Sequence, residues 1–223
     1  MHINDLNRDQ KIKVIIQGFV MSVLLLSFAA ILYNITFNHA EKLDPMLYDV
    51  KIPIIDDKIP AIPVFFFGYN LGFIYWFFAS FFIVLTGKKK TYKFIVTFVI
   101  TIIICNLILY FFPTKLDRVA EGLYNPSHTG FLWKLMHICY SVDGGFVGYN
   151  LFPSTHCANS ILFYQAMKDD AIDIKFQRVA LVSTIIVIVS TLLTKQHYFI
   201  DVVAGVLIPI IMKSIIDKIW RQI

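Results

Sequence analysis

Two histidines and one aspartate have the residue types and the spacing that a nucleophilic site needs. His197 and Asp201 lie four positions apart, and on a helix this spacing places two side chains on one face. The carboxylate can then hydrogen-bond one imidazole nitrogen, which fixes the tautomer and leaves the other nitrogen as a nucleophile. His156 follows the segment 153–155, and a second histidine can protonate a leaving oxygen.

The segment before His156 has the features of a helix start. Ser154 or Thr155 can cap such a helix, and the free N–H groups of a first turn favour a bound anion. A phosphate group is therefore the expected ligand, and its oxygens need positive charges. The candidate cations are Lys115, Arg118 and Lys195.

These residues predict phosphoryl transfer. His197 would attack the phosphorus, His156 would protonate the leaving oxygen, and water would cleave the phosphohistidine. This scheme needs neither a cofactor nor a metal. Two alternatives remain: a structural His–Asp pair, because such spacings arise by chance, and a site in which two histidines and Asp201 hold a metal. The spacing favours Asp201 as a partner of His197 over a metal ligand.

The elements that must position these residues are membrane helices. The chain has 223 residues, of which 57% are hydrophobic and 16% charged, whereas about a quarter of a soluble protein is charged. The net charge of +5 does not indicate nucleic acid, because the basic residues form short runs between apolar segments. The cysteines, at positions 105, 139 and 157, have the spacing of neither a disulfide framework nor a zinc site.

The apolar segments predict one all-α domain over residues 1–223, a polytopic bundle of six transmembrane helices. The expected spans are 14–37, 64–85, 94–112, 154–167, 179–193 and 198–216. The connection 113–152 is long for a compact membrane protein, which is typical of a functional segment. Within it, 131–140 is short and amphipathic, and we expect it to lie in the outer headgroup layer as a partial lid.

The distribution of basic residues predicts the orientation. Thirteen of the 20 lysines and arginines lie in the N-terminal segment, in 87–93, in 168–178 and from residue 213 onward. The positive-inside rule therefore predicts a multi-pass plasma-membrane protein with both termini in the cytoplasm. The histidines emerge on the opposite side, so the active site is expected to be extracytoplasmic.

These motifs resemble those of a known family. The segment 153–156, together with Ser190, His197 and Asp201, is similar to the second and third motifs of the type 2 phosphatidic acid phosphatase (PAP2) superfamily, which contains metal-independent lipid phosphatases and phosphotransferases. The stretch 194–205 resembles the branch that includes inositol phosphorylceramide synthases and many small bacterial membrane phosphatases. Two further segments, 112–118 and 54–60, resemble that branch's first motif and its loop before the second span.

The resemblance implies a six-helix bundle and a role for each motif residue. His197 would be the nucleophile, Asp201 its partner and His156 the acid, while Ser154 and Arg118 would bind phosphate. The chain departs from the family's pattern by having Thr191, Phe111 and Val119 in place of an arginine, a lysine and a proline. Two cations of the phosphate pocket are thus missing, and we expect Lys115 and Lys195 to replace them.

The sequence therefore predicts a lipid phosphatase that acts on phosphatidic acid or on an isoprenyl diphosphate such as undecaprenyl diphosphate. Its partners would be a phosphorylated lipid and the bilayer, with no nucleic acid, and the sequence indicates no particular oligomeric state. A phosphotransferase with an alcohol acceptor would use the same histidines. A transporter or flippase would use the intramembrane charges as a path, although the chain has no inverted repeat. An inactive scaffold is the remaining alternative.

Overall fold

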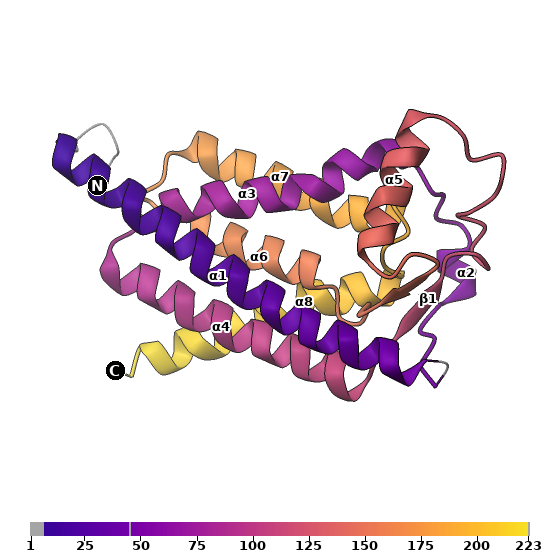
Figure 1. Ribbon diagram of the computed structural model, residues 1–223. Helices are drawn as coiled ribbons and strands as arrows, with labels where there is room; N and C mark the ends of the chain where they lie inside the picture. Colours follow the sequence, from indigo (N-terminus) through magenta and orange to yellow (C-terminus); the bar gives the residue numbers. More distant parts are fainter. Residues whose placement is uncertain (1–6, 45, 223) are drawn as a thin grey trace.

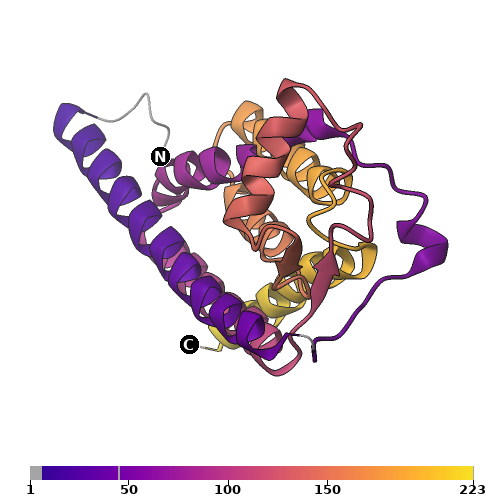
Figure 2. The ribbon, with the colours of Figure 1, turned by 45° about the vertical axis from the view of Figure 1, so that its right-hand side comes forward.

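The computed structural model describes residues 7–44 and 46–222, and this part of the chain is mostly helical. Its longer helices run side by side, with the two described ends of the chain at one end of the bundle (Figure 1). Their bounds are α1 Arg8–Leu43, α3 Phe66–Val84, α4 Lys88–Phe111, α6 Thr155–Met167, α7 Ile174–Leu193 and α8 Phe199–Trp220. Helix α1 lies at the outside of the bundle against α3 and α4 (Figure 2).

Five of these helices are long and apolar enough to cross a membrane. They are α1, α3 extended back to Pro63, α4, α7 and α8. Helix α6 has 13 residues, whereas a span needs about 20. The described residues thus contain five candidate spans, and the predicted count of six transmembrane helices is not confirmed.

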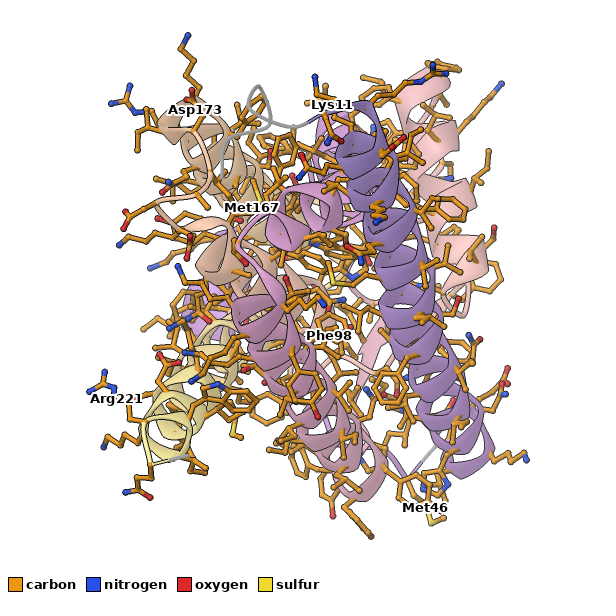
Figure 3. The ribbon with its side chains drawn as sticks, turned by 90° about the vertical axis from the view of Figure 1, so that its left-hand side faces the viewer. Lys11, Met46, Phe98, Met167, Asp173 and Arg221 are labelled. Atoms are coloured by element: carbon orange, nitrogen blue, oxygen red, sulfur yellow. The ribbon has the colours of Figure 1, made fainter. Side chains whose placement is uncertain are left out.

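Helix α6 occupies the middle of the bundle, where it packs against α3, α4, α7 and α8 (Figure 1). Aromatic rings pack against α6: the ring centroid of Phe163 lies 5.2 Å from that of Phe94 and 5.8 Å from that of Phe98. Phe98 is fully buried on α4, inside the bundle (Figure 3). Polar contacts also hold it: the indole N–H of Trp76 donates to Ser160 Oγ at 3.1 Å. A helix with neighbours on all sides has no solvent face, which explains the mixture of small, polar and aromatic residues in its sequence.

A layer of short elements covers the other end of the bundle. It contains α2 (Pro53–Asp56), the 3₁₀ turn η2 (Pro63–Phe65) and α5 (Phe131–Val142). Strands β1 (Lys115–Asp117) and β2 (Val147–Tyr149) pair antiparallel. The segment 131–140, which the sequence marked as short and amphipathic, forms α5, and its place in the outer headgroup layer stays a prediction. The two strands were not predicted. We call these elements the cap layer.

Candidate active site

The N-terminus of α6 lies directly against α8. Thr155 begins α6, and the side chain of Ser154 caps it, accepting a hydrogen bond from the N–H of Cys157 at 3.4 Å. The backbone N–H of Ser154 donates to the carbonyl of Asp201 at 3.0 Å. A Cβ on Gly205 would lie only 2.4 Å from the Ser154 carbonyl oxygen. The glycine therefore permits the approach that joins the two histidine motifs.

His197 and Asp201 approach each other through a turn. His197 precedes α8, and Asp201 lies in its first turn, so the expected shared helical face is wrong for this pair. The Nδ1 of His197 lies 3.7 Å from Asp201 Oδ2, which is longer than a hydrogen bond. That oxygen instead accepts the backbone N–H of Tyr198 at 2.7 Å. The pair is therefore close but not hydrogen-bonded.

An aromatic cage surrounds His156. Its ring stacks on Tyr69 with 4.1 Å between centroids, and Phe73 and Trp76 lie 5.3 Å away. The Tyr69 hydroxyl is 3.2 Å from His156 Nδ1. Since this contact occupies Nδ1, the other ring nitrogen is the one available for chemistry. The backbone hydrogen bond from Ser154 to Asp201 brings the segment that carries His156 against the segment that carries His197.

Arg118 is fully buried and joins the cap layer to the turn that precedes α8. Its Nη1 donates to the carbonyls of Asp143 and Gly145 at 2.8 and 2.7 Å. Its Nη2 contacts the carboxylate of Asp143 at 3.0 Å and Gln196 Oε1 at 2.7 Å. Gln196 directly precedes His197 in the chain. The guanidinium therefore joins the end of β1, the end of α5 and the turn that carries His197.

Four buried polar atoms of this site have no hydrogen-bond partner among the described residues. They are Arg118 Nε, His156 Nε2, His197 Nδ1 and Asp201 Oδ1. Nearly all buried polar atoms in folded proteins are paired, and an exception calls for an explanation such as a catalytic role. The unpaired atoms thus lie on residues that the sequence predicts to be catalytic or phosphate-binding.

Comparison with known protein families decides the assignment. A family model described as the PAP2 superfamily matches residues 55–214, more than half of the chain. The chain belongs to the PAP2 superfamily. Searches of the curated proteins and of the solved structures gave no match. Members of this superfamily are phosphatases, so membership supports phosphatase-type hydrolysis of a lipid phosphate as the general reaction, and the apolar helices are consistent with a membrane protein.

The two lysines expected to replace the missing PAP2 cations have other partners. Lys195 Nζ donates to the Asp56 carbonyl at 2.7 Å and lies 3.8 Å from Glu121 Oε2. Burial lowers the pKa of Lys195. Lys115 Nζ contacts Asp44 Oδ1 at 2.7 Å, just beyond the end of α1. Their role as phosphate ligands in this PAP2 member stays a prediction.

Asp143 was not singled out from the sequence. Its carboxylate contacts Arg118 and accepts a 2.5 Å hydrogen bond from the hydroxyl of Tyr33. Burial raises the pKa of Asp143, although Arg118, Tyr33 and His197 act in the opposite direction. No local pattern marks it, because its partner Tyr33 is 110 residues away in the sequence.

Tyr69, the partner of His156, was missed for a similar reason. It lies in an aromatic-rich span in which many tyrosines and phenylalanines have the same appearance in the sequence.

As for the metal alternative, the described residues contain no group of three or more His, Cys, Asp and Glu side chains arranged to hold an ion.

Proposed function

We propose that this PAP2 member is a membrane lipid phosphatase that hydrolyses a lipid phosphate or diphosphate through a phosphohistidine on His197, without a metal. The substrate would be of the phosphatidic acid or isoprenyl diphosphate class. The observation that carries the proposal is that His197 Nδ1 and His156 Nε2 are both buried and unpaired, on two segments that the Ser154–Asp201 backbone hydrogen bond holds together. These atoms belong to residues inside the segment that matches the family.

In the first step, Nε2 of His197 would form a bond to phosphorus while the bond to the leaving oxygen breaks. The imidazole becomes positively charged, and its Nδ1–H needs an acceptor. Asp201 Oδ1 is buried and free to accept it, so a small rotation of either side chain would stabilise the cation. Protonated His156 would give its Nε2 proton to the leaving oxygen.

In the second step, His156 would take a proton from water as that water attacks phosphorus. The bond between nitrogen and phosphorus breaks, which releases phosphate and restores His197. The contact between the Tyr69 hydroxyl and Nδ1 of His156 leaves Nε2 as the nitrogen that exchanges the proton. Each histidine therefore has one nitrogen for orientation and one for chemistry.

The phosphate would bind at the N-terminus of α6. The backbone N–H groups of Thr155 and His156 have no hydrogen-bond acceptor in the described structure, and such groups favour anions. Ser154 caps the same turn, and Arg118 Nε is the one guanidinium nitrogen that remains unpaired. Additional positive charge from Lys115 or Lys195 would require them to leave their present partners.

The orientation of the protein in the membrane is part of the same proposal. We place the protein in the plasma membrane with both termini in the cytoplasm and the histidines on the outer side. The basic runs at 87–93, 168–178 and the chain ends support this orientation. The described ends of the chain lie together at the end of the bundle away from the cap layer (Figure 1), as such a topology requires.

A phosphotransferase is the second candidate, because the cap layer contains a polar cavity beside the turn that carries His197. Its volume is about 430 Å³, and its lining includes Lys51, Glu121, Trp133 and Lys195. Lys195 is two residues before His197. A polar acceptor alcohol in this cavity could replace water in the second step.

The test uses the purified protein in detergent with EDTA. Phosphate release from phosphatidic acid and from an isoprenyl diphosphate would be measured for the wild type, His197→Ala and His156→Ala. His39→Ala is the matched control, because His39 stacks on Tyr110 and has no contact with the site. We expect the first two variants to abolish release and the control to keep it. Loss of wild-type activity on adding EDTA would refute the metal-free mechanism.

Labelled substrate separates the two candidates. Label recovered as free phosphate supports the phosphatase, whereas label on an acceptor lipid supports the phosphotransferase.

A further inference from the structure

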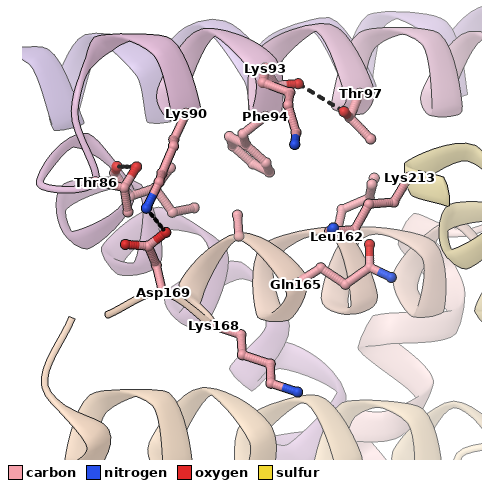
Figure 4. Close-up of a pocket in the computed structure, with 12 residues that line it drawn as sticks. Thr86, Lys90, Lys93, Phe94, Thr97, Leu162, Gln165, Lys168, Asp169 and Lys213 are labelled. Atoms are coloured by element: carbon pink, nitrogen blue, oxygen red, sulfur yellow. Dashed lines mark hydrogen bonds and ion pairs between the residues drawn. The ribbon is translucent and has the colours of Figure 1, made fainter. Parts of the chain in front are cut away.

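A second cavity lies at the opposite end of the bundle from the histidines. Its volume is about 190 Å³, and the start of α4, the end of α6 and the second half of α8 surround it (Figure 4). Gln165, which lines it, is nine residues after His156 on α6. At 1.5 Å per residue, this separation is about 14 Å along the helix. The cavity is therefore distinct from the proposed catalytic site.

Positive charge dominates the lining of this cavity. Four of the lining residues are lysines: Lys90, Lys93, Lys168 and Lys213. Asp169 pairs with Lys90 at 2.6 Å, while Asp217 pairs with both Lys93 and Lys213 at 2.5 Å. The lining thus contains four lysines and one carboxylate, Asp169, while the second carboxylate, Asp217, pairs with two of these lysines from outside the lining. Lys93 and Lys213 extend into the space from α4 and α8, on two sides of it (Figure 4).

The cavity also has an unpaired acceptor and an apolar wall. The side-chain oxygen Oε1 of Gln165 is buried and has no hydrogen-bond partner in the part of the chain described here. Phe94 and Leu162 form part of the lining. A suitable ligand would bring a negative charge for the lysines, a hydroxyl donor for Gln165 and apolar atoms for Phe94. These are the chemical groups of an anionic phospholipid with a hydroxylated headgroup.

We propose that this cavity binds the headgroup of an anionic phospholipid such as phosphatidylglycerol. The phosphate would contact Lys93 and Lys213, a glycerol hydroxyl would donate to Gln165, and an acyl chain would follow the apolar wall. The cavity lies among the basic ends of candidate spans, where headgroups meet the protein and where basic pockets between helices bind acidic lipids. This proposal is independent of the phosphatase proposal, since neither site uses a residue of the other.

The experiment measures the melting temperature of the detergent-solubilised protein with added phosphatidylglycerol or phosphatidylcholine. Lys213→Gln removes one charge and leaves Asp217 paired with Lys93. Lys218→Gln is the matched control, because it makes the same charge change five residues along α8, at an exposed position outside the cavity lining. Ala166→Leu fills the cavity without changing its charge, since Ala166 is part of the lining.

We expect phosphatidylglycerol to raise the melting temperature of the wild type and of Lys218→Gln by several degrees more than phosphatidylcholine does. The extra rise should fall to half or less in Lys213→Gln and in Ala166→Leu. An equal loss in Lys218→Gln and Lys213→Gln would overturn the proposal, because it would indicate a diffuse attraction between lipid and protein. An unchanged effect in a folded Ala166→Leu protein would also overturn it.

Two further measurements complete the test. If Ala166→Leu does not fold, the comparison of Lys213→Gln with Lys218→Gln still distinguishes lipid binding in the cavity from a diffuse attraction. Inorganic phosphate without lipid is added in a separate arm. The same stabilisation by phosphate alone would contradict a lipid site and identify a site for free anions.

Discussion

The contact between Gly205 of α8 and the N-terminus of α6 yields a quantitative prediction for Gly205→Ala. The added Cβ would lie 2.4 Å from the Ser154 carbonyl oxygen and 3.0 Å from Cys157 Cβ. Ordinary van der Waals contact begins at 3.4 Å. The start of α6 must therefore move away from α8 by about 1 Å, because a backbone carbonyl cannot rotate aside as a side chain can.

The expected effect on activity is larger than the effect on stability. Overpacking of this kind costs about 1 to 3 kcal/mol, and the better helix propensity of alanine returns about 1 kcal/mol. A 1 Å displacement between His156 and His197 can cost about 100-fold in rate. We expect kcat/KM to fall about 100-fold while the melting temperature changes by only a few degrees.

The assay is phosphate release per folded protein, together with a melting curve. Gly18→Ala is the matched control, since its Cβ would lie 2.8 Å from the Phe81 backbone on the far side of the bundle. It should lower stability to a similar extent and leave kcat/KM unchanged. If Gly205→Ala retains activity within about threefold of the wild type, the reasoning that this contact sets the distance between the histidines is wrong.

Three further predictions concern the surroundings of the histidines. Tyr69→Phe keeps the ring that stacks on His156 but removes a hydrogen bond of about 1 kcal/mol. The value of kcat should therefore fall about five- to tenfold. An unchanged kcat and pH profile would mean that the hydroxyl does not orient His156. Burial raises the pKa of the Asp143 carboxyl group above 3.8. The folded protein therefore binds the carboxyl proton more tightly than the unfolded chain does. The free energy of unfolding should fall as the pH rises through the range above 3.8, where the unfolded chain has lost this proton. Asp143→Asn should lose that component of the pH dependence in melting curves, and an identical dependence would contradict the shift. Lys195→Ala should raise KM for the lipid phosphate about tenfold if Lys195 moves to the phosphate, with Lys58→Ala as control, and an unchanged KM would refute that role.

The hydropathy of the chain predicted most of the fold. The expected spans agree with α1, α3, α4, α7 and α8 to within a few residues at most ends, because long apolar segments carry a strong signal. Helix α1 extends beyond its apolar part at both ends, since polar residues continue a helix that already has a nucleus. The strands of the cap layer, with three residues each, are too short to give a periodic pattern.

The residue types of the site were predictable, but its contacts were not. Ser154 caps α6 as expected, because capping depends on local sequence. The approach of His197 to Asp201 follows a turn that the spacing alone did not reveal. The bond between Arg118 and Gln196 spans 78 residues of sequence, and such a contact exists only after the helices have packed.

The short length of α6 also has a consequence for how the protein enters the membrane. Its 13 residues cover about 20 Å, which is less than the roughly 30 Å of a hydrocarbon core. This helix therefore lacks the length of an independent insertion signal, and its polar N-terminal motif would be costly to expose to lipid. It can be accommodated only once α3, α4, α7 and α8 are present to surround it. On the proposed membrane topology, the two histidine motifs would thus meet only at the last stage of biogenesis, after the candidate spans are in the bilayer.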